Sequence, residues 1–252
     1  MIYKQVLNMI YKQNEINIMA QGGKILVDIL NKLKSATKPG MQTLDLDQIA
    51  QKLIKKDATF AFKNYRGYPA NICVSINEEI VHGVPSSKKI KQEDIITIDL
   101  GIKYKDYCTD AAISFIVGKP TPIQQRLLDI TSLALKKAIA KIKPNVPLVE
   151  ISREIEKTIK EGGLNIVKDL TGHGVGKNLQ EEPSVYNWEV DEKIILKEGM
   201  VLALEPMATT GIGDISVLSD NWTIVTSDGA LSAQFEKTIA ITKDGYLDLT
   251  PW

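Results

Sequence analysis

Four carboxylates stand inside apolar, strand-like segments, where burying a lone acid would be costly. Asp99 lies in "IITIDLGI", Asp110 in "CTDAAISF", Glu205 in "VLALEPMA" and Glu236 in "AQFEKTIAI". An unpaired charge in an apolar interior needs a partner, and these segments contain few basic residues. Divalent metal ions meet that need, because carboxylate oxygens suit manganese, iron, cobalt and zinc. The four acids therefore predict a metal centre.

One histidine joins this set because of its setting. The chain has 2 histidines, and His173 lies between glycines in "LTGHGVGKNLQEEP". Glycines let the backbone pass close to a metal centre, and imidazole is a common ligand. Four carboxylates and one imidazole exceed the usual ligand set of a catalytic zinc and fit two bridged ions roughly 3.5–4 Å apart. Taken singly, each residue could instead be an ordinary turn, edge or loop residue.

Helices and strands that could position these residues are predicted in two rounds. A helix is predicted from Asn14 to the break at Lys38-Pro39-Gly40, and a second restarts with Thr43 as its N-cap. The same order returns with a helix over 121–143, a break at Pro144 and a restart. Strands with alternating polarity are predicted over 106–118 and 229–245.

Short motifs repeat in the same order. "HGV" occurs at 82–84 and at 173–175, and "KQEDIITIDLG" is echoed by "KEGMVLALEPM". The spacing between corresponding motifs is unequal, which argues against a solenoid of short repeats. These features predict two related halves that share one core of strands and helices, with accidental similarity of the motifs as the alternative.

Composition narrows the class of protein. The 252 residues include 31 basic and 31 acidic ones, so no overall field points to nucleic acid or an anionic membrane. Two cysteines are too few for a disulfide framework, and no signal peptide or membrane span is evident, so a cytoplasmic protein is expected. A monomer is expected because no broad apolar stripe is left unexplained. "IYKQ" occurs at 2–5 and at 10–13, which leaves Met1 or Met9 as the start, and residues 1–9 are given no function.

The motifs together resemble a known family. "RGYPANICVSINEEIVHGVP", "DIITIDLG", "GHGVG", "EEP", "LEPM" and "SAQFEKTIAIT" follow one another between about Ile10 and Leu249. In this order they resemble the type 1 methionine aminopeptidases of the short bacterial kind, which are pita-bread metallopeptidases. The resemblance implies an α+β fold in which two pseudo-symmetric halves surround a dinuclear metal site, with a central antiparallel sheet covered by helices. It implies a single domain over 1–252, with 1–13 as an N-terminal extension and entry strand and halves of about 14–118 and 119–250.

The resemblance also implies roles for individual residues. Asp99 matches the terminal metal ligand, Asp110 and Glu236 match the bridging carboxylates, and His173 and Glu205 match the remaining ligands. His82 matches a histidine that stands beside the substrate and positions the reacting amide. The pocket for the methionine side chain would include Tyr65, Tyr68, Cys73 and Trp222, with Phe62 and Leu179 replacing residues often seen there. Asn77, the carbonyl of Glu79, and Ser232 match a loop that binds sodium or potassium in some relatives.

The implied reaction removes the initiator methionine from nascent polypeptides whose second residue is small. In that family a metal-bridged hydroxide attacks the amide, and Glu205 would act as the proton shuttle. Two divalent ions (cobalt, manganese, iron or zinc) would be the cofactors. A transient ribosome contact is compatible with this role, although the net charge gives no support for a strong grip on ribosomal RNA.

Gln180 departs from the family pattern. A second histidine usually stands just before "EEP", and this chain has glutamine there. Glutamine can donate a hydrogen bond but cannot carry the positive charge of an imidazolium. If that charge stabilises the transition state, the loss would be roughly 10²–10³ in rate, and if only the hydrogen bond matters the loss would be small. The sequence predicts an active enzyme, and its rate depends on which of these two effects Gln180 has.

Two other functions fit parts of the pattern. Aminopeptidase P and prolidase share the metal set but normally carry an added amino-terminal domain, for which this chain has no room before Ile16. A non-catalytic pita-bread module that binds peptides or nucleic acid would usually lack metal ligands, and only Gln180 favours that alternative.

Overall fold

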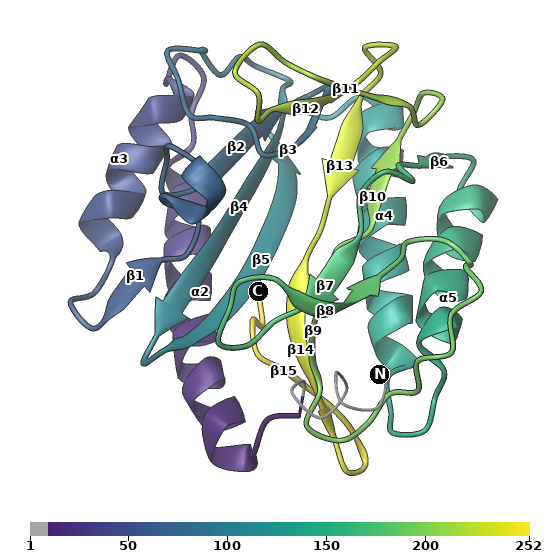
Figure 1. The fold of residues 1–252 in the computed structure, drawn as a ribbon. Helices are drawn as coiled ribbons and strands as arrows, with labels where there is room; N and C mark the ends of the chain where they lie inside the picture. Colours follow the sequence, from purple (N-terminus) through teal and green to yellow (C-terminus); the bar gives the residue numbers. More distant parts are fainter. Residues whose placement is uncertain (1–9) are drawn as a thin grey trace.

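The computed structural model describes residues 10–252. Four α-helices flank a layer of strands in this range, with α2 and α3 on one side and α4 and α5 on the other (Figure 1). The helices span α2 Gln13–Ala36, α3 Thr43–Leu53, α4 Pro122–Ala140 and α5 Leu148–Glu161. A short 3₁₀ turn, η1, covers Tyr65–Gly67. Among the described residues, no helix has the length and apolar character needed to cross a membrane.

The strands divide between the two halves of the chain. The first half holds β1 Ala58–Phe60, β2 Cys73–Ile76, β3 Glu79–Val81, β4 Ile95–Tyr104 and β5 Tyr107–Ile116. The second half holds β6 Asn165–Ile166, β7 Gly172–Gly174, β8 Glu181–Val185, β9 Val201–Leu204, β10 Met207–Thr209, β11 Ile215–Val217, β12 Ile224–Thr226, β13 Ser232–Gln234, β14 Lys237–Thr242 and β15 Gly245–Asp248. All described strand pairs are antiparallel, which confirms the α+β class.

Backbone pairing groups the strands into four antiparallel sheets. The two larger ones have the orders β1-β4-β2, with β5 paired to β4, and β15-β14-β9-β7-β8. Two three-stranded sheets, β13-β10-β6 and β11-β12-β3, complete the layer, and the second contains strands from both halves. The central layer expected from the sequence is therefore present, although its backbone ladders are not continuous.

A seam of hydrogen bonds joins β5 to the β13–β14 segment. Ala112 and Glu236 exchange backbone bonds of 3.4 and 2.9 Å. On one side of this pair, the Thr238 hydroxyl accepts from the amide of Asp110 (2.8 Å) and donates to its carbonyl (2.7 Å). On the other, the hydroxyl of Ser114 donates to the carbonyl of Gln234. The seam brings Asp110 and Glu236 close together although they are far apart in the sequence.

Each helix pair covers its own apolar core. The first core packs α2 and α3 against β2, β4 and β5, and it includes Leu30 and Leu33, which are fully buried. The second packs α4 and α5 against β9 and β14. Full burial of one leucine contributes about 1.5–3 kcal/mol, so these faces hold the two sides of the layer in place. The division into halves of about 14–118 and 119–250 remains a prediction.

Two local expectations need correction, and a third lies largely outside the described residues. The N-cap of α3 is Gln42 and not Thr43, because the amide of Gln42 is bound by Asp45 (2.8 Å) while the hydroxyl of Thr43 accepts from the amide of Ser86. The strand expected over 229–245 is interrupted at 235–236, since β13 pairs with β10 and β14 pairs with β9. In the expected entry strand, residues 10–12 belong to no strand and Gln13 begins α2, while 1–9 lie outside the described residues.

Candidate active site

Asp99 and Asp110 reach one face of the same hairpin. A two-residue turn, in which Lys105 and Asp106 have φ of 45° and 70°, connects β4 to β5. Such a turn sets the register of the hairpin, here with Asp99 opposite Ala112 and Asp110 opposite Gly101. Residues opposite one another point to the same face, so the two aspartates lie diagonally on that face.

His173 sits on β7 between glycines that the packing requires. A Cβ at Gly172 would overlap the carbonyl of Ala203, and one at Gly174 would overlap the carbonyl of Glu182. His173 pairs with Ala203 of β9, two residues before Glu205. The glycines beside this histidine are therefore required because the neighbouring backbone lies too close to leave room for a side chain.

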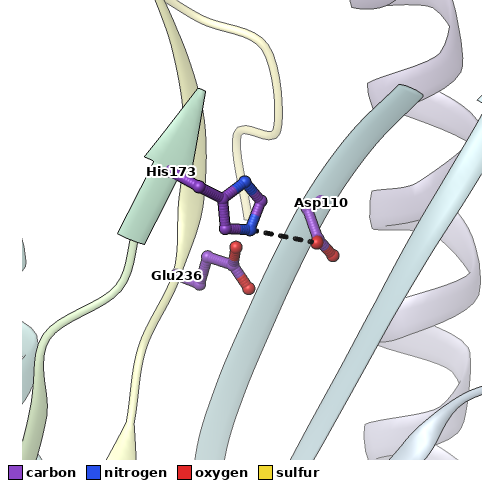
Figure 2. Close-up of side chains that lie close together, drawn as sticks. All are labelled: Asp110, His173 and Glu236. Atoms are coloured by element: carbon purple, nitrogen blue, oxygen red, sulfur yellow. Dashed lines mark ion pairs between the residues drawn. The ribbon is translucent and has the colours of Figure 1, made fainter. Parts of the chain in front are cut away.

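Four of the five expected ligand residues converge within a few ångströms. Donor atoms of Asp110, His173 and Glu236 all lie within 4.8 Å of one another (Figure 2). His173 Nε2 is 3.5 Å from Glu205 Oε1 and 4.0 Å from Asp110 Oδ2. Nδ1 of the same ring is 2.9 Å from the Gly174 carbonyl. A proton on Nδ1 satisfies that carbonyl and leaves the lone pair of Nε2 directed at the acids.

Asp99 completes a buried, unpaired acidic cluster. Asp99, Asp110, Glu205 and Glu236 are at most 8% exposed, and none of the ion pairs in the described part of the chain joins them to a lysine or arginine. Asp99 Oδ1, Asp110 Oδ1 and Glu236 Oε1 have no hydrogen-bond partner. Buried carboxylate oxygens without partners are costly, so the cluster suits a cation that they could bind together.

Burial changes the protonation of the cluster. It raises the pKa of Asp110 to about 7. It also raises the pKa of Asp99, Glu205 and Glu236, and repulsion by neighbouring carboxylates adds to the rise. Burial lowers the pKa of His173, which keeps its imidazole neutral and able to bind a metal. A divalent ion would replace the protons that otherwise neutralise these acids.

His82 and the aromatic residues line a cavity that opens onto the acids. The cavity has a volume of about 170 Å³, which suits one amino-acid side chain better than a large ligand. The expected substrate residues that line it are Phe62, Tyr65, Tyr68, Cys73, His82, Leu179, Gln180 and Trp222. The structure thus brings all of these together with the four acids and His173.

The inner wall of this cavity is apolar. The ring of Tyr68 meets Phe62 and Trp222 edge to face, with centroids 6.4 and 5.2 Å apart. The Tyr68 hydroxyl lies 3.1 Å from the carbonyls of Ile72 and Gly83, so its polar end is satisfied inside the wall. Burial raises the pKa of Cys73 and keeps its thiol neutral. Aromatic rings and a neutral sulfur form favourable contacts with a thioether.

His82 follows β3 in a left-handed conformation, with φ of 58°. This conformation is uncommon for a residue other than glycine. Burial lowers the pKa of His82, so its imidazole is neutral near pH 7 and offers one N–H donor to the cavity. Gln180 lies at the exposed rim, where its Oε1 is 3.5 Å from the Tyr65 hydroxyl.

Two further residues of the site were not expected from the sequence. Gln234 donates from Nε2 to Glu205 Oε2 at 3.0 Å, and Arg66 lines the cavity. Arg66 stands within the motif "RGYP" directly after Tyr65. The prediction that Tyr65 lines the pocket could therefore have pointed to Arg66 as well. Gln234 lies two residues before Glu236, and only the pairing of β13 with β10 reveals that it meets Glu205.

The loop of Asn77, Glu79 and Ser232 is compact. The hydroxyl of Ser232 lies 2.9 Å from the Asn77 carbonyl and 3.1 Å from the Glu79 carbonyl. The side chains of Asn77 and Glu79 are engaged elsewhere, by Asp94 and Lys88. Only carbonyl and hydroxyl oxygens converge here, which are the donors a monovalent cation would use. Its binding remains a prediction.

Tyr11, near the start of the described residues, is hydrogen-bonded to the loop that carries Leu179 and Gln180. The Tyr11 hydroxyl donates to Glu181 Oε2 (2.7 Å) and accepts from the amide of Lys177 (3.1 Å). Glu181 also accepts from the amide of Asn178 at 2.8 Å. Tyr11 is 8% exposed, and the bond between its hydroxyl and the Glu181 carboxylate is partly buried.

Tyr11→Phe is expected to loosen this loop. A hydrogen bond to a charged group contributes about 1.5–3 kcal/mol, so exchange of the Lys177 and Asn178 amides should accelerate about 10- to 100-fold. Hydrogen exchange measures this directly. Tyr107→Phe is the matched control, because its ring packs on Tyr11 but its hydroxyl bonds Glu15 instead. Equal acceleration in both variants would show that Tyr11 does not hold the loop.

Comparison with known proteins agrees with this architecture. Residues 17–243 match the model of metallopeptidase family M24. Methionine aminopeptidase 1 of Bacillus subtilis is 42% identical over 238 residues, which cover 94% of this chain and 96% of the relative. A methionine aminopeptidase of Thermotoga maritima has the same fold, with a TM-score of 0.94, 38% identity and coverage of 96% and 99% of the two chains.

A more distant structure supports only the fold of this chain. Prolidase from Pyrococcus furiosus superimposes with a TM-score of 0.78 at 23% identity, over 99% of this chain and 67% of the prolidase. The predicted pita-bread fold is confirmed by these likenesses. This chain belongs to metallopeptidase family M24 and, within that family, groups with the methionine aminopeptidases.

Proposed function

We propose that this protein removes the amino-terminal methionine from peptides and nascent chains whose second residue is small. The observation that carries the proposal is a buried acidic cluster with one histidine at the floor of an aromatic cavity. The relatives that share almost the whole chain are named methionine aminopeptidases, which supports the same substrate. An apolar cavity of side-chain size selects methionine, and the acids at its end would meet the scissile amide.

We propose two divalent ions (manganese, iron, cobalt or zinc) as cofactors. Asp99 would bind one ion, His173 and Glu205 the other, and Asp110 and Glu236 would bridge them. Support comes from the unpartnered oxygens, the raised pKa values and the mixed oxygen and nitrogen donors. When bound, such ions supply an activated water and polarise the scissile carbonyl.

The protein's own residues would supply the remaining steps. Glu205 would take a proton from the attacking water and pass it to the leaving amine, while Gln234 holds its Oε2 in place. The neutral His82 would donate a hydrogen bond beside the developing tetrahedral centre. Gln180 would donate from its amide at the rim, without the charge of a histidine.

Proton release should make metal binding strongly dependent on pH. The folded-state pKa values of the four acids lie above their ordinary values, so the stability that these groups contribute to the metal-free protein is full below about pH 4 and is lost as the pH rises, through about 7 for Asp110. Manganese replaces these protons, so its stabilisation should grow across that window. The rise in melting temperature on adding manganese should be clearly larger at about pH 7.5 than at about pH 5.5. Calorimetry of Glu236→Gln should show a weaker pH dependence, and a pH-independent rise would contradict the cluster as the site.

The activity is tested by methionine release from Met-Ala-Ser with manganese, cobalt or ferrous iron, for the wild type and for Gln180→His. Both are expected to turn over. The histidine variant should be about tenfold faster, because a hydrogen bond from a charged donor is roughly twice as strong as one from a neutral donor. A wild type without turnover that histidine rescues would mean that the site is attenuated at this residue alone.

Controls separate the remaining alternatives. A peptide of the type Xaa-Pro tests for prolidase-like specificity and should not be cleaved. If metal binds but neither enzyme variant releases methionine, the protein is a binding module and the proposal fails.

We also propose a monomer in the cytoplasm, a sodium or potassium ion at Asn77, Glu79 and Ser232, and at most a transient ribosome contact. Sedimentation with and without ribosomes tests the first and last of these.

A further inference from the structure

Arg66 stands at the cavity with its charge unused. It is exposed and lines the cavity rim, and among the described residues it takes part in no ion pair or side-chain hydrogen bond. The guanidinium lies 5.3 Å from the centroid of the Tyr65 ring. A guanidinium on an aromatic face keeps its edge N–H groups free for a planar anion.

The backbone holds Arg66 in an unusual position. Its φ is 50°, and Asn64 and Gly67 beside it have φ of 67° and 93°. Main-chain bonds from Asn64 to the Tyr68 carbonyl and from Tyr68 to the Tyr65 carbonyl close this turn, each 2.9 Å long. A left-handed conformation costs roughly 1–3 kcal/mol for a residue such as arginine, and such residues gather at binding sites. The turn therefore orients Tyr65 and Arg66 towards the cavity together.

The distribution of charge around the cavity indicates which part of a substrate Arg66 would contact. The acids lie at the buried floor, whereas the neighbour of Tyr65 across the rim is the uncharged Gln180. A peptide whose first side chain fills the aromatic cavity must extend its later residues outwards past this rim. Those residues then pass a free guanidinium with no competing cation from position 180.

We propose that Arg66 binds a carboxylate of the substrate that lies beyond the cleaved bond, so that acidic substrates are preferred. The carboxylate comes either from an acidic side chain after the second residue or from the carboxyl terminus of a short peptide. The proposal rests on the proposed function, since it assumes that methionine occupies the cavity.

Four peptides separate these sources. Met-Ala-Asp-Ser-amide is compared with Met-Ala-Asn-Ser-amide, and Met-Ala-Ser with Met-Ala-Ser-amide, at low and at high salt. The wild type is expected to prefer the acidic member of each pair by about fivefold in kcat/KM, mainly through KM, and to lose the preference at high salt. Arg66→Gln should remove the preference within each pair, because the guanidinium that would bind the carboxylate is gone. Arg66→Lys should keep part of the preference.

Lys63→Gln is the matched control, because it removes one exposed positive charge from the same segment but does not line the cavity. It should keep the wild-type preference. An unchanged preference in Arg66→Gln, or an equal loss for acidic and neutral peptides, would overturn the proposal and make Arg66 a wall residue only. If only Met-Ala-Ser is preferred over its amide, the carboxyl terminus is the source. If the wild type cleaves no peptide, the proposed function fails, and calorimetric binding of the same four peptides decides the role of Arg66 separately.

Discussion

Glu205→Gln is expected to lower kcat/KM for Met-Ala-Ser by about 10³-fold or more while it stabilises the metal-free protein. The loss of activity follows because Glu205 would both bind a metal ion and carry the proton to the leaving amine. Proton transfer by a positioned carboxylate alone is worth roughly 10²–10⁴ in rate. Steady-state kinetics with manganese measures it.

The gain in stability has a separate cause. Glu205 is one of four buried carboxylates, and burial together with repulsion by Asp110 raises its pKa. A neutral glutamine of similar shape removes one of these charges. Each kcal/mol so relieved should raise the melting temperature by about 2–4 °C for a chain of this size. The gain should be present near neutral pH and vanish below about pH 4, where the wild-type carboxyl is protonated as well.

A matched substitution tests whether both effects belong to the cluster. Glu198→Gln changes an exposed carboxylate close by in the sequence, so it should alter neither rate nor stability appreciably. If Glu205→Gln lowers the melting temperature of the chelated protein at neutral pH, the cluster is not under electrostatic strain. If it retains most of its activity, another group moves the proton.

The two histidines of the chain are expected to fail in different ways. His173→Ala should lose metal affinity by at least about 100-fold, since even outer partners of metal ligands change affinity by 10–100-fold. His82→Ala should keep its bound metal and lose roughly 10²–10³ in kcat, because removal of one donor beside a developing charge costs that much. Metal titration and kinetics on the same preparations measure both quantities.

Backbone conformation matters for the choice at His82. Alanine is poorly suited to φ of 58°, whereas asparagine tolerates it and keeps a donor of shorter reach. His82→Asn should therefore fold at least as well as His82→Ala and recover part of the rate. Loss of metal from His82→Ala, or full metal binding by His173→Ala, would reverse the proposed assignment of the two residues.

The buried acidic cluster could be anticipated from residue types, whereas the role of each residue was implied by the resemblance to the methionine aminopeptidases. Carboxylates in apolar strands indicate a function, because burial of an unpaired charge is expensive. A histidine between glycines adds to that indication. Alternation along β4 and β5 also placed Asp99 and Asp110 on defined faces. The breaks at Pro39 and Pro144 marked where helices had to end, because proline cannot continue an interior turn.

Contacts between distant segments were decided only by the tertiary structure. The interruption at 235–236 arises because β13 and β14 pair with different partners, which no local pattern records. The same holds for Gln234 at Glu205, Tyr11 at Glu181 and the rim position of Arg66. Local propensity and periodicity act over a few residues, so the sequence by itself determined which side chains are buried and which chemistry they offer. Which of them meet depends on strand pairing and loop closure across more than a hundred residues, and the packed fold alone settles that.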